Sequence, residues 1–151
     1  MANVFDVAKY FLMLAASGEE DAGEAMTHLK LQKLLYYGQG FHLALNSGKP
    51  LFADSIEAWK QGPVVNSIWR NYKEKGGAPI PPDENFDPSK CLSEDERALL
   101  NDVWNAYGQF SAWKLRNMTH EELPWRNAYE PDKNAIIPIK SMQNYFATQI
   151  E

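Results

Sequence analysis

The sequence predicts a mainly α-helical fold: a compact helical bundle of about six helices with room for one small β-hairpin. Apolar residues recur at helical spacing in most segments of the chain, and residues typical of helix ends separate these segments. The chain has 151 residues, of which 44% are hydrophobic and 23% charged, as in an ordinary globular protein. We therefore expect residues 1–151 to form one domain with its own core.

Two long helices are expected in the first third of the chain. Apolar residues at helical spacing predict a helix over 4–15. A second helix is expected over 27–46, and it is apolar on most of its circumference, which is typical of a buried helix. Gly38 and Gly40 each cost about 1 kcal/mol relative to alanine inside that helix, so we expect another backbone to approach there closely. The acidic stretch 17–23 predicts a solvated loop or a region that only a partner orders.

Proline and glycine mark the middle of the chain. Proline is favoured in the first turn of a helix, so Pro63 is expected to begin a helix that runs to Lys75. Residues 54–60 and 79–82 are the candidates for a small hairpin, and periodicity alone leaves their strand content open. The proline-rich segment 78–92 predicts an ordered loop or an extended edge.

Polar caps divide the second half of the chain into further helices. Ser93 and Glu96 have the spacing of a capping box and predict a helix that Gly108 ends at its C′ position. The hydroxyl of Ser111 is expected to cap a short helix that runs through Leu115.

The end of the chain carries a second cap signal and a last helix. Thr119 and Glu122 repeat the capping-box spacing, before a turn that contains Pro124. Pro138 is expected to begin a helix over 138–150. The residues expected to face inward from that helix are Ile139, Met142, Phe146 and Ile150.

The charge and the single cysteine exclude several classes of protein. The 15 basic and 20 acidic residues give a net charge of −5, which argues against non-specific binding to nucleic acid or to an anionic membrane. No segment has the roughly 18–20 consecutive apolar residues of a transmembrane helix, and Asp6 and Lys9 interrupt the N-terminal apolar stretch, unlike a signal peptide. Cys91, the sole cysteine, cannot form an intrachain disulfide, which favours a cytoplasmic location.

The residues that most often carry chemistry form no recognisable catalytic or metal motif. His28, His42, His120 and Cys91 lack the short paired spacings of zinc ligands, so we expect no metal and no cofactor. Cys91 has no neighbouring base to activate it. We interpret His42 as a core or groove residue and His120 as a residue with a local polar contact. An enzyme with an unrecognised site near His42 and His120 stays open as an alternative.

A second alternative is a regulator that binds DNA. The segment 96–118 has the outline of a helix-turn-helix, and its second helix carries Lys114 and Arg116. That helix is short, however, and Trp113 and Leu115 are expected to be buried. Two helices packed at a corner are therefore the preferred interpretation, and we expect no nucleic-acid partner.

Tryptophans gather beside rigid turns. Trp59 precedes the sequence Gly62-Pro63-Val64, Trp69 follows it, and Trp125 follows Pro124. Tryptophan is enriched at the energetic centres of protein interfaces, because it supplies a large contact area at low conformational cost. Taken one at a time, these tryptophans are expected in the core. A groove near these turns would be a protein- or peptide-binding site.

Three motifs in order give the chain a family resemblance. They are Leu31-Gln32-Lys33-Leu34-Leu35-Tyr36-Tyr37, Ala58-Trp59-x-x-Gly62-Pro63-Val64 and Thr119-His120-x-x-x-Pro124-Trp125. With the further strings FDVAKYFL, KPLF and VWNAYGQFSAWKL, they resemble the Panacea-domain family of GepA-like or SocA-like phage-associated proteins. The resemblance covers about residues 4–130.

The resemblance implies a cytoplasmic antitoxin, encoded beside a toxin gene in bacteria or their prophages. Members of this family neutralise different toxins mostly by direct protein contact, and some hand the toxin to a protease as adaptors. The implied partners are therefore a cognate toxin and a cytoplasmic protease. A homo-oligomer stays open as well, because exposed aromatic side chains can serve a homodimer as well as a partner. No enzymatic activity characterises the family, so none is expected here.

The residues and the resemblance together suggest a surface for the partner. We expect Gly62 and Pro63 to fix the turn, with Val64 beside them, Trp59 and Trp125 to supply contact area, and His120 to supply a polar group. We assign no catalytic residue. The net charge of −5 would favour encounter with a basic toxin.

Overall fold

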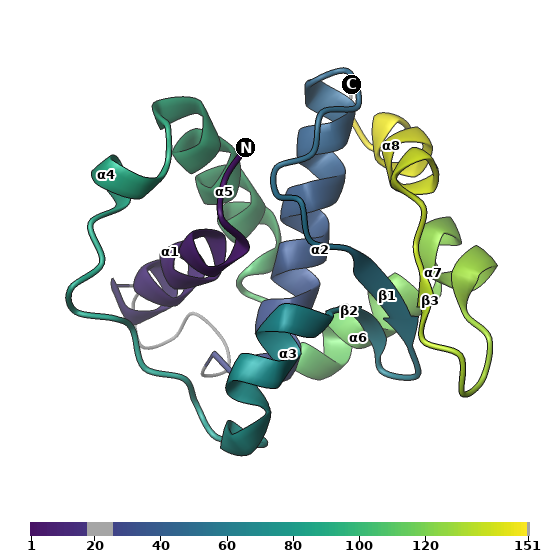
Figure 1. Ribbon diagram of the computed structural model, residues 1–151, viewed down its shortest axis with the longest axis horizontal. Helices are drawn as coiled ribbons and strands as arrows, with labels where there is room; N and C mark the ends of the chain where they lie inside the picture. The colour runs from purple at the N-terminus through teal and green to yellow at the C-terminus, as the bar shows by residue number, and fades with distance from the viewer. Residues whose placement is uncertain (18–25, 151) are drawn as a thin grey trace.

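The computed structural model describes residues 1–17 and 26–150 (Figure 1). In these ranges it has eight α-helices, one short 3-10 helix and three strands, so the expected mainly α-helical class is confirmed. The predicted acidic loop lies, beyond Ser17, outside the described residues. The elements are α1 (Val4–Ser17), α2 (His28–Leu45), β1 (Ile56–Trp59), β2 (Gly62–Val65), α3 (Asn66–Tyr72), η1 (Lys73–Lys75), α4 (Pro88–Cys91), α5 (Glu94–Tyr107), α6 (Ala112–His120), α7 (Leu123–Ala128), β3 (Ala135–Ile136) and α8 (Ile139–Ala147).

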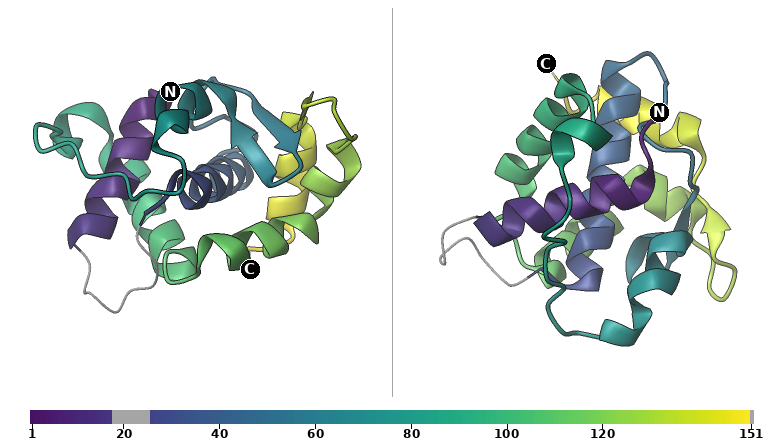
Figure 2. Two further views of the ribbon diagram at one scale, coloured as in Figure 1. Left: turned by 90° about the horizontal axis from the view of Figure 1, so that it is seen from below. Right: turned by 60° about the vertical axis from the view of Figure 1, so that its left-hand side comes forward.

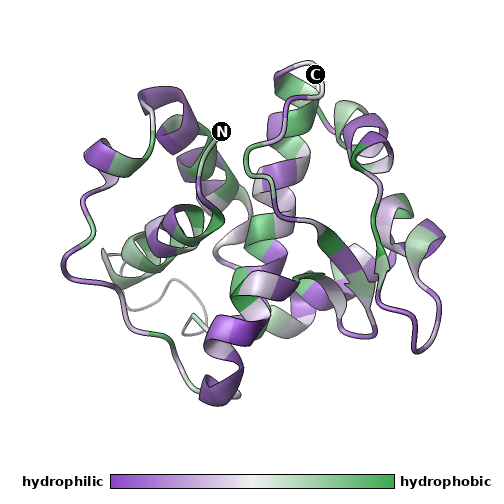
Figure 3. Ribbon diagram, viewed as in Figure 1, coloured by the Kyte–Doolittle hydropathy of each residue, from purple (hydrophilic) through white to green (hydrophobic). Residues whose placement is uncertain are grey.

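Helix α2 is the centre of the fold. Figure 2 shows it nearly end-on, with the other helices and the sheet arranged around it. Every residue from Leu31 to Gly40 is buried, as expected for a helix with apolar residues on most of its circumference. Hydrophilic residues colour the outward turns of α5 and of the α3–η1 segment (Figure 3). No helix in the described ranges is long and apolar enough to cross a membrane.

The sheet differs from the expected hairpin in its partners. Strand β1 lies within the candidate segment 54–60, and it pairs antiparallel with β2 on one side and β3 on the other. Residues 79–82 form no strand. The two strands that pair with β1 are 62–65, across a tight turn, and 135–136, from near the end of the chain.

The expectation that Pro63 begins a helix is wrong. Pro63 lies in β2 opposite Ala58, and the helix begins three residues later, at Asn66. Strand β2 is at the edge of the sheet, where a residue without an N–H group is tolerated. Helix α3 continues into η1, which ends at Gly76 with a positive φ of 54°.

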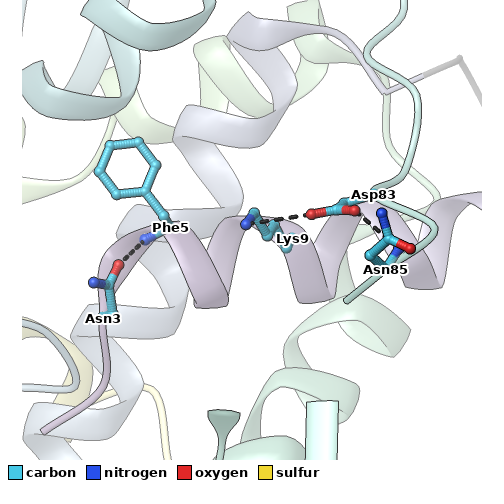
Figure 4. A network of polar contacts seen from close by, with 5 residues as sticks. All are labelled: Asn3, Phe5, Lys9, Asp83 and Asn85. Carbon is cyan, nitrogen blue, oxygen red and sulfur yellow. Dashed lines mark hydrogen bonds and ion pairs between the residues drawn. The ribbon is translucent and has the colours of Figure 1, made fainter. Parts of the chain in front are cut away.

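The segment before α5 is an ordered loop that contains the short helix α4. An ion pair of 3.3 Å between Lys9 Nζ and Asp83 Oδ2 joins it to α1 (Figure 4). The backbone N–H of Asn85 donates to Asp83, and this bond together with Lys9 lowers the pKa of the Asp83 carboxyl. At the start of α1, Asn3 Oδ1 accepts a hydrogen bond from the Phe5 N–H.

The cap signals of the second half have mixed outcomes. The Ser93–Glu96 capping box is present, and Gly108 ends α5 with an ordinary helical φ of −64° rather than a left-handed C′ conformation. Ser111 caps α6, which continues well past the expected end at Leu115.

The prediction of a second capping box, at Thr119 and Glu122, is wrong. Thr119 lies inside α6, where its hydroxyl donates to the Arg116 carbonyl, and Glu122 directs its carboxylate to tyrosines instead. Helix α8 begins after Pro138 as expected, with Met142 and Phe146 buried. Ile139, expected to face inward, is 45% exposed.

The glycines of α2 make room for side chains rather than for another backbone. A Cβ atom on Gly40 would lie 2.1 Å from the ring of Phe146, which is fully buried in α8. A Cβ atom on Gly38 would meet its nearest atom, in Leu100, at an ordinary contact distance of 3.4 Å. Gly40 is therefore what allows α8 to pack closely against α2.

These two glycines give a matched pair of substitutions. We expect Gly40→Ala to lower the free energy of unfolding by about 3 kcal/mol, because the buried Phe146 ring has nowhere to move. Gly38→Ala should instead raise it by up to about 1 kcal/mol through helix propensity. Urea unfolding monitored by circular dichroism measures both; equal effects of the two variants would contradict this account of α8 packing.

Candidate functional site

The three sequence motifs meet in one region of the structure. The first motif is the buried middle of α2, the second is the β1–β2 hairpin, and the third is the α6–α7 junction. Figures 1 and 2 show the hairpin and the junction on neighbouring sides of α2. Trp125 of α7 donates its indole N–H to the Trp59 carbonyl of β1 at 2.7 Å. Several buried polar groups join these segments, and we describe them from α2 outward.

The side-chain amide of Gln32 joins α2 to strand β2. It pairs with both the N–H and the carbonyl of one β2 residue, as the backbone of a neighbouring strand would. Its side-chain oxygen accepts the Val65 N–H at 2.7 Å, and its amide nitrogen donates to the Val65 carbonyl at 3.2 Å. The amide also lies 2.9 Å from His28 Nε2, which therefore acts as an acceptor. Burial, together with the charge of Lys33, lowers the pKa of His28 to about 4, so the ring is neutral at neutral pH.

Lys33 lies beneath the hairpin turn. It is fully buried, and its Nζ is 3.4 Å from the Pro63 carbonyl. Burial, and then the nearby charge of Arg116, lower the pKa of Lys33 to about 7. Gly62 has a φ of 112°, and a Cβ atom there would lie 2.7 Å from Lys33 Cε and 2.9 Å from Thr119 Oγ1. Both the conformation and the close packing require glycine at this turn.

Glu122 joins α2 to the segment between α6 and α7. Its two carboxylate oxygens accept hydrogen bonds from Tyr36 and Tyr37, each at 2.9 Å, and Tyr145 of α8 lies nearby. Burial raises the pKa of Glu122 to about 7, although the tyrosine hydrogen bonds act in the opposite direction. One buried carboxyl group therefore holds α2 to the segment between α6 and α7.

An aromatic stack lies on one side of the hairpin. The ring of His120 stacks on Trp125 at 4.0 Å, and Trp125 stacks on Tyr129 at 4.6 Å. His120 Nε2 is the one buried side-chain nitrogen or oxygen in the described residues that has no hydrogen-bond partner. Burial is the main cause of the lowered pKa of His120, so the neutral ring is favoured in this stack.

A groove lies on the other side of the hairpin, and we call it the tryptophan groove. It has a volume of about 290 Å³ and includes the Trp59 and Trp69 rings, whose centroids are 5.2 Å apart. Lys73 Nζ lies 5.0 Å from the centre of the Trp69 ring, a cation–π distance. The groove is lined by His28, Leu29, Gln32, Trp59, Gln61, Val64, Trp69, Lys73 and Gly76.

The structure places the residues expected at the partner surface in three settings. Trp59 and Val64 line the tryptophan groove. Gly62 and Pro63 are buried at the start of β2, directly after the turn, where they fix the shape of the hairpin. The third setting is the stack on the opposite side of the hairpin, which contains His120 and Trp125. Their contact with a partner stays a prediction.

The structure separates the residues of the enzymatic alternative. His42 lies near the C-terminal end of α2, where its Nδ1 is 2.7 Å from the Lys49 carbonyl. It lines a hollow between α2 and α5, and His120 does not line that hollow. Cys91 is exposed on α4. Among the described residues, no group of three or more His, Cys, Asp or Glu side chains is arranged to hold a metal ion.

Two residues of the helix-turn-helix interpretation also have defined positions. Leu115 is buried as expected, but Trp113 is 63% exposed. Arg116 lies 4.7 Å from the Trp113 ring centre and donates to Gln61 of the hairpin turn at 2.6 Å. Arg116 thus contacts the chain's own surface residues.

Comparison with known proteins identifies relatives of this chain. A family model described as "Antitoxin SocA-like, Panacea domain" matches residues 31–126. Antitoxin SocA of Caulobacter vibrioides is 41% identical over 51 residues, which are 34% of this chain and 27% of that protein. The aligned part thus spans about a quarter of the curated relative's length. No solved structure matches the chain significantly.

Substitution of Gly62 tests the packing of the hairpin on Lys33. We expect Gly62→Ala to lower the free energy of unfolding by about 2 kcal/mol more than Gly76→Ala does. Both glycines have a positive φ, but a Cβ atom at Gly76 has nothing within 4 Å. Chemical denaturation of the two variants measures the difference, and equal losses would mean that Lys33 and Thr119 move aside freely.

The buried Glu122 predicts a pH dependence of stability. Its folded-state pKa is raised, so between pH 4.5 and 7 the folded protein keeps a proton that the unfolded chain releases, and stability is lost as the pH rises. We expect wild type to lose on the order of 3 kcal/mol relative to Glu122→Gln across this range.

Urea denaturation of both proteins at several pH values measures this difference. The opposite contribution of His28, whose pKa is lowered, is present in both proteins and cancels in the comparison. A wild-type curve parallel to that of Glu122→Gln would show that folding does not raise the pKa of Glu122.

Proposed function

The chain belongs to the family of SocA-like antitoxins with a Panacea domain, and from this premise we propose that it binds a cognate toxin, encoded beside it, and neutralises it by direct contact. We further propose that residues 1–151 act as one domain in the cytoplasm. The toxin-binding surface in this proposal lies on both sides of the β1–β2 turn, in the tryptophan groove and at the His120–Trp125 stack.

The observation that carries the proposal is the rigid support beneath these aromatic side chains. The Trp125 indole donates a hydrogen bond to the Trp59 carbonyl. Gln32 and Lys33 of α2 form hydrogen bonds to β2, the other strand of the hairpin that carries Trp59. Large side chains that are already ordered lose little conformational entropy on binding. A surface of this kind is suited to covering a partner protein.

The tryptophan groove fits an apolar side chain of a partner. Trp59, Trp69 and Val64 supply its apolar walls, and Gln61 and Lys73 supply polar groups. A buried apolar anchor surrounded by polar groups is the usual arrangement at the centre of a protein interface. Neutralisation by occlusion requires no chemical step, and this supports a non-enzymatic role.

Delivery of the toxin to a protease is the second mode open to an antitoxin of this kind. Occlusion leaves a stable complex and an unchanged amount of toxin, whereas delivery lowers the amount of toxin without a lasting complex. Co-expression with the product of the adjacent gene, scored by growth, co-purification and toxin level, separates the two. A neighbouring product that is harmless when expressed alone would remove the basis of the antitoxin proposal.

Trp59→Ala is the direct test of the tryptophan groove. We expect the variant to fold and to bind the toxin at least about tenfold more weakly, because truncation of a tryptophan anchor commonly costs that much. Isothermal calorimetry with the purified toxin gives the affinity. Ile139→Ala, which shortens an exposed apolar side chain outside the groove, is the control and should bind like wild type. Unchanged binding by Trp59→Ala would remove the groove from the interface.

A further inference from the structure

A second groove runs between the C-terminal part of α2 and helix α5, and we call it the α2–α5 groove. It consists of two adjoining hollows of about 470 and 360 Å³, which share Leu45, Leu99 and Asp102. The apolar part includes Phe41 of α2 and Leu45, which is 55% exposed, and Gln149 and Ile150, which follow α8, also line it. An exposed apolar floor between two helices is typical of a surface that a further helix covers.

Helix α5 presents a regular stripe to this groove. Asp95, Leu99, Asp102 and Ala106 follow one another at intervals of four, three and four residues, so they lie on one face of the helix. At 1.5 Å per residue the stripe is about 16 Å long, or three helical turns. The groove therefore has the length and the straight course that a helix of three or more turns requires.

The charges along the groove have one sign. Asp95 and Asp102 are exposed, and no lysine or arginine lines either hollow. Within the described residues the two ion pairs involve Asp83 and Asp87 instead. Asp95 in the first turn of α5 offsets the helix dipole, but Asp102 lies in the middle of the helix, where no dipole explains it.

We propose that the α2–α5 groove binds a basic amphipathic helix of the toxin, with apolar side chains against Leu45 and Leu99 and with lysine or arginine beside Asp95 and Asp102. This inference rests on the proposed function. It adds the chemistry of the partner, since the apolar floor selects an amphipathic segment and the unpaired carboxylates select a basic one.

The two grooves lie at opposite ends of helix α2. His28 of the tryptophan groove and Leu45 of the α2–α5 groove are separated by about 25 Å along α2. The toxin segment in the α2–α5 groove is therefore distinct from the apolar anchor at Trp59. Variants of the two grooves can be tested independently.

A synthetic peptide tests the α2–α5 groove without the toxin. The probe is a fluorescein-labelled helix of about 18 residues with leucine at positions i, i+4 and i+7 and lysine on its flanks. We expect the wild-type protein to bind it in an anisotropy titration, and the double variant Asp95→Lys/Asp102→Lys to bind about tenfold or more weakly.

The matched control is Glu84→Lys/Asp132→Lys, which makes the same change in net charge at exposed positions outside both grooves. We expect this control to bind the peptide within about twofold of wild type at physiological ionic strength, because distant surface charges are screened. Equal weakening by both double variants, or no binding by wild type, would overturn the proposal.

A second copy of the chain is the alternative occupant of the groove. Light scattering after size exclusion gives the oligomeric state of wild type and of Leu45→Arg. We expect both proteins to be monomers. A wild-type dimer that Leu45→Arg converts to a monomer would assign the groove to self-association and overturn the proposal.

Growth rescue separates failure of this inference from failure of the proposed function. If Asp95→Lys/Asp102→Lys loses neutralisation of the co-expressed toxin and Glu84→Lys/Asp132→Lys retains it, the α2–α5 groove is part of the toxin interface. If both double variants neutralise the toxin as well as wild type does, the groove proposal is overturned while the antitoxin function stands. If wild type does not neutralise the neighbouring product, the proposed function fails, and the peptide titration alone decides about the groove.

Discussion

The structure depends on one constraint: the central helix α2 buries polar side chains, and each of them has to find a partner inside the protein. An unsatisfied buried polar group costs more than its hydrogen bond would contribute. Gln32 meets this requirement through strand β2, Lys33 through the hairpin carbonyl, and Tyr36 and Tyr37 through Glu122. The partners lie in or directly beside the two other sequence motifs, so satisfying α2 also fixes the hairpin and the α6–α7 junction.

The same constraint connects the fold to the proposed function. The hairpin that α2 holds from below carries Trp59 at the tryptophan groove, and Trp125 is bonded to the same strand. The opposite end of α2 supplies Leu45 to the α2–α5 groove, where the surrounding charges are acidic. A rigid helix thus presents two chemically different surfaces, which suits a protein whose task is to cover another protein. Several contact regions would also restrict which toxin fits.

Local sequence signals predicted the helices well, and they failed where tertiary contacts decide. Residues that begin helices were identified correctly where the cap is local, as at Ser93 and Ser111. Pro63 was misplaced because the periodicity of its segment does not show that it lies at a sheet edge. The capping spacing of Glu122 was misleading because its partners are more than 80 residues away.

For the site, the sequence indicated Trp59 and Trp125, but it assigned no role to Gln32 and Lys33. The signal that could have identified these two residues is the presence of polar residues inside an otherwise apolar helix.

Hydrogen exchange measured by mass spectrometry on the protein, alone and in complex with the product of the adjacent gene, tests the central claim most directly. The account predicts slower amide exchange on binding in two regions: the β1–β2 hairpin with α3 and the α6–α7 junction, and the α5 face that contains Leu99. The outer side of α8 stays unchanged. Protection confined to α8 or to the β3 edge would contradict the assignment of both grooves. Failure of the two proteins to form any complex, with the toxin present and active, would contradict neutralisation by direct contact.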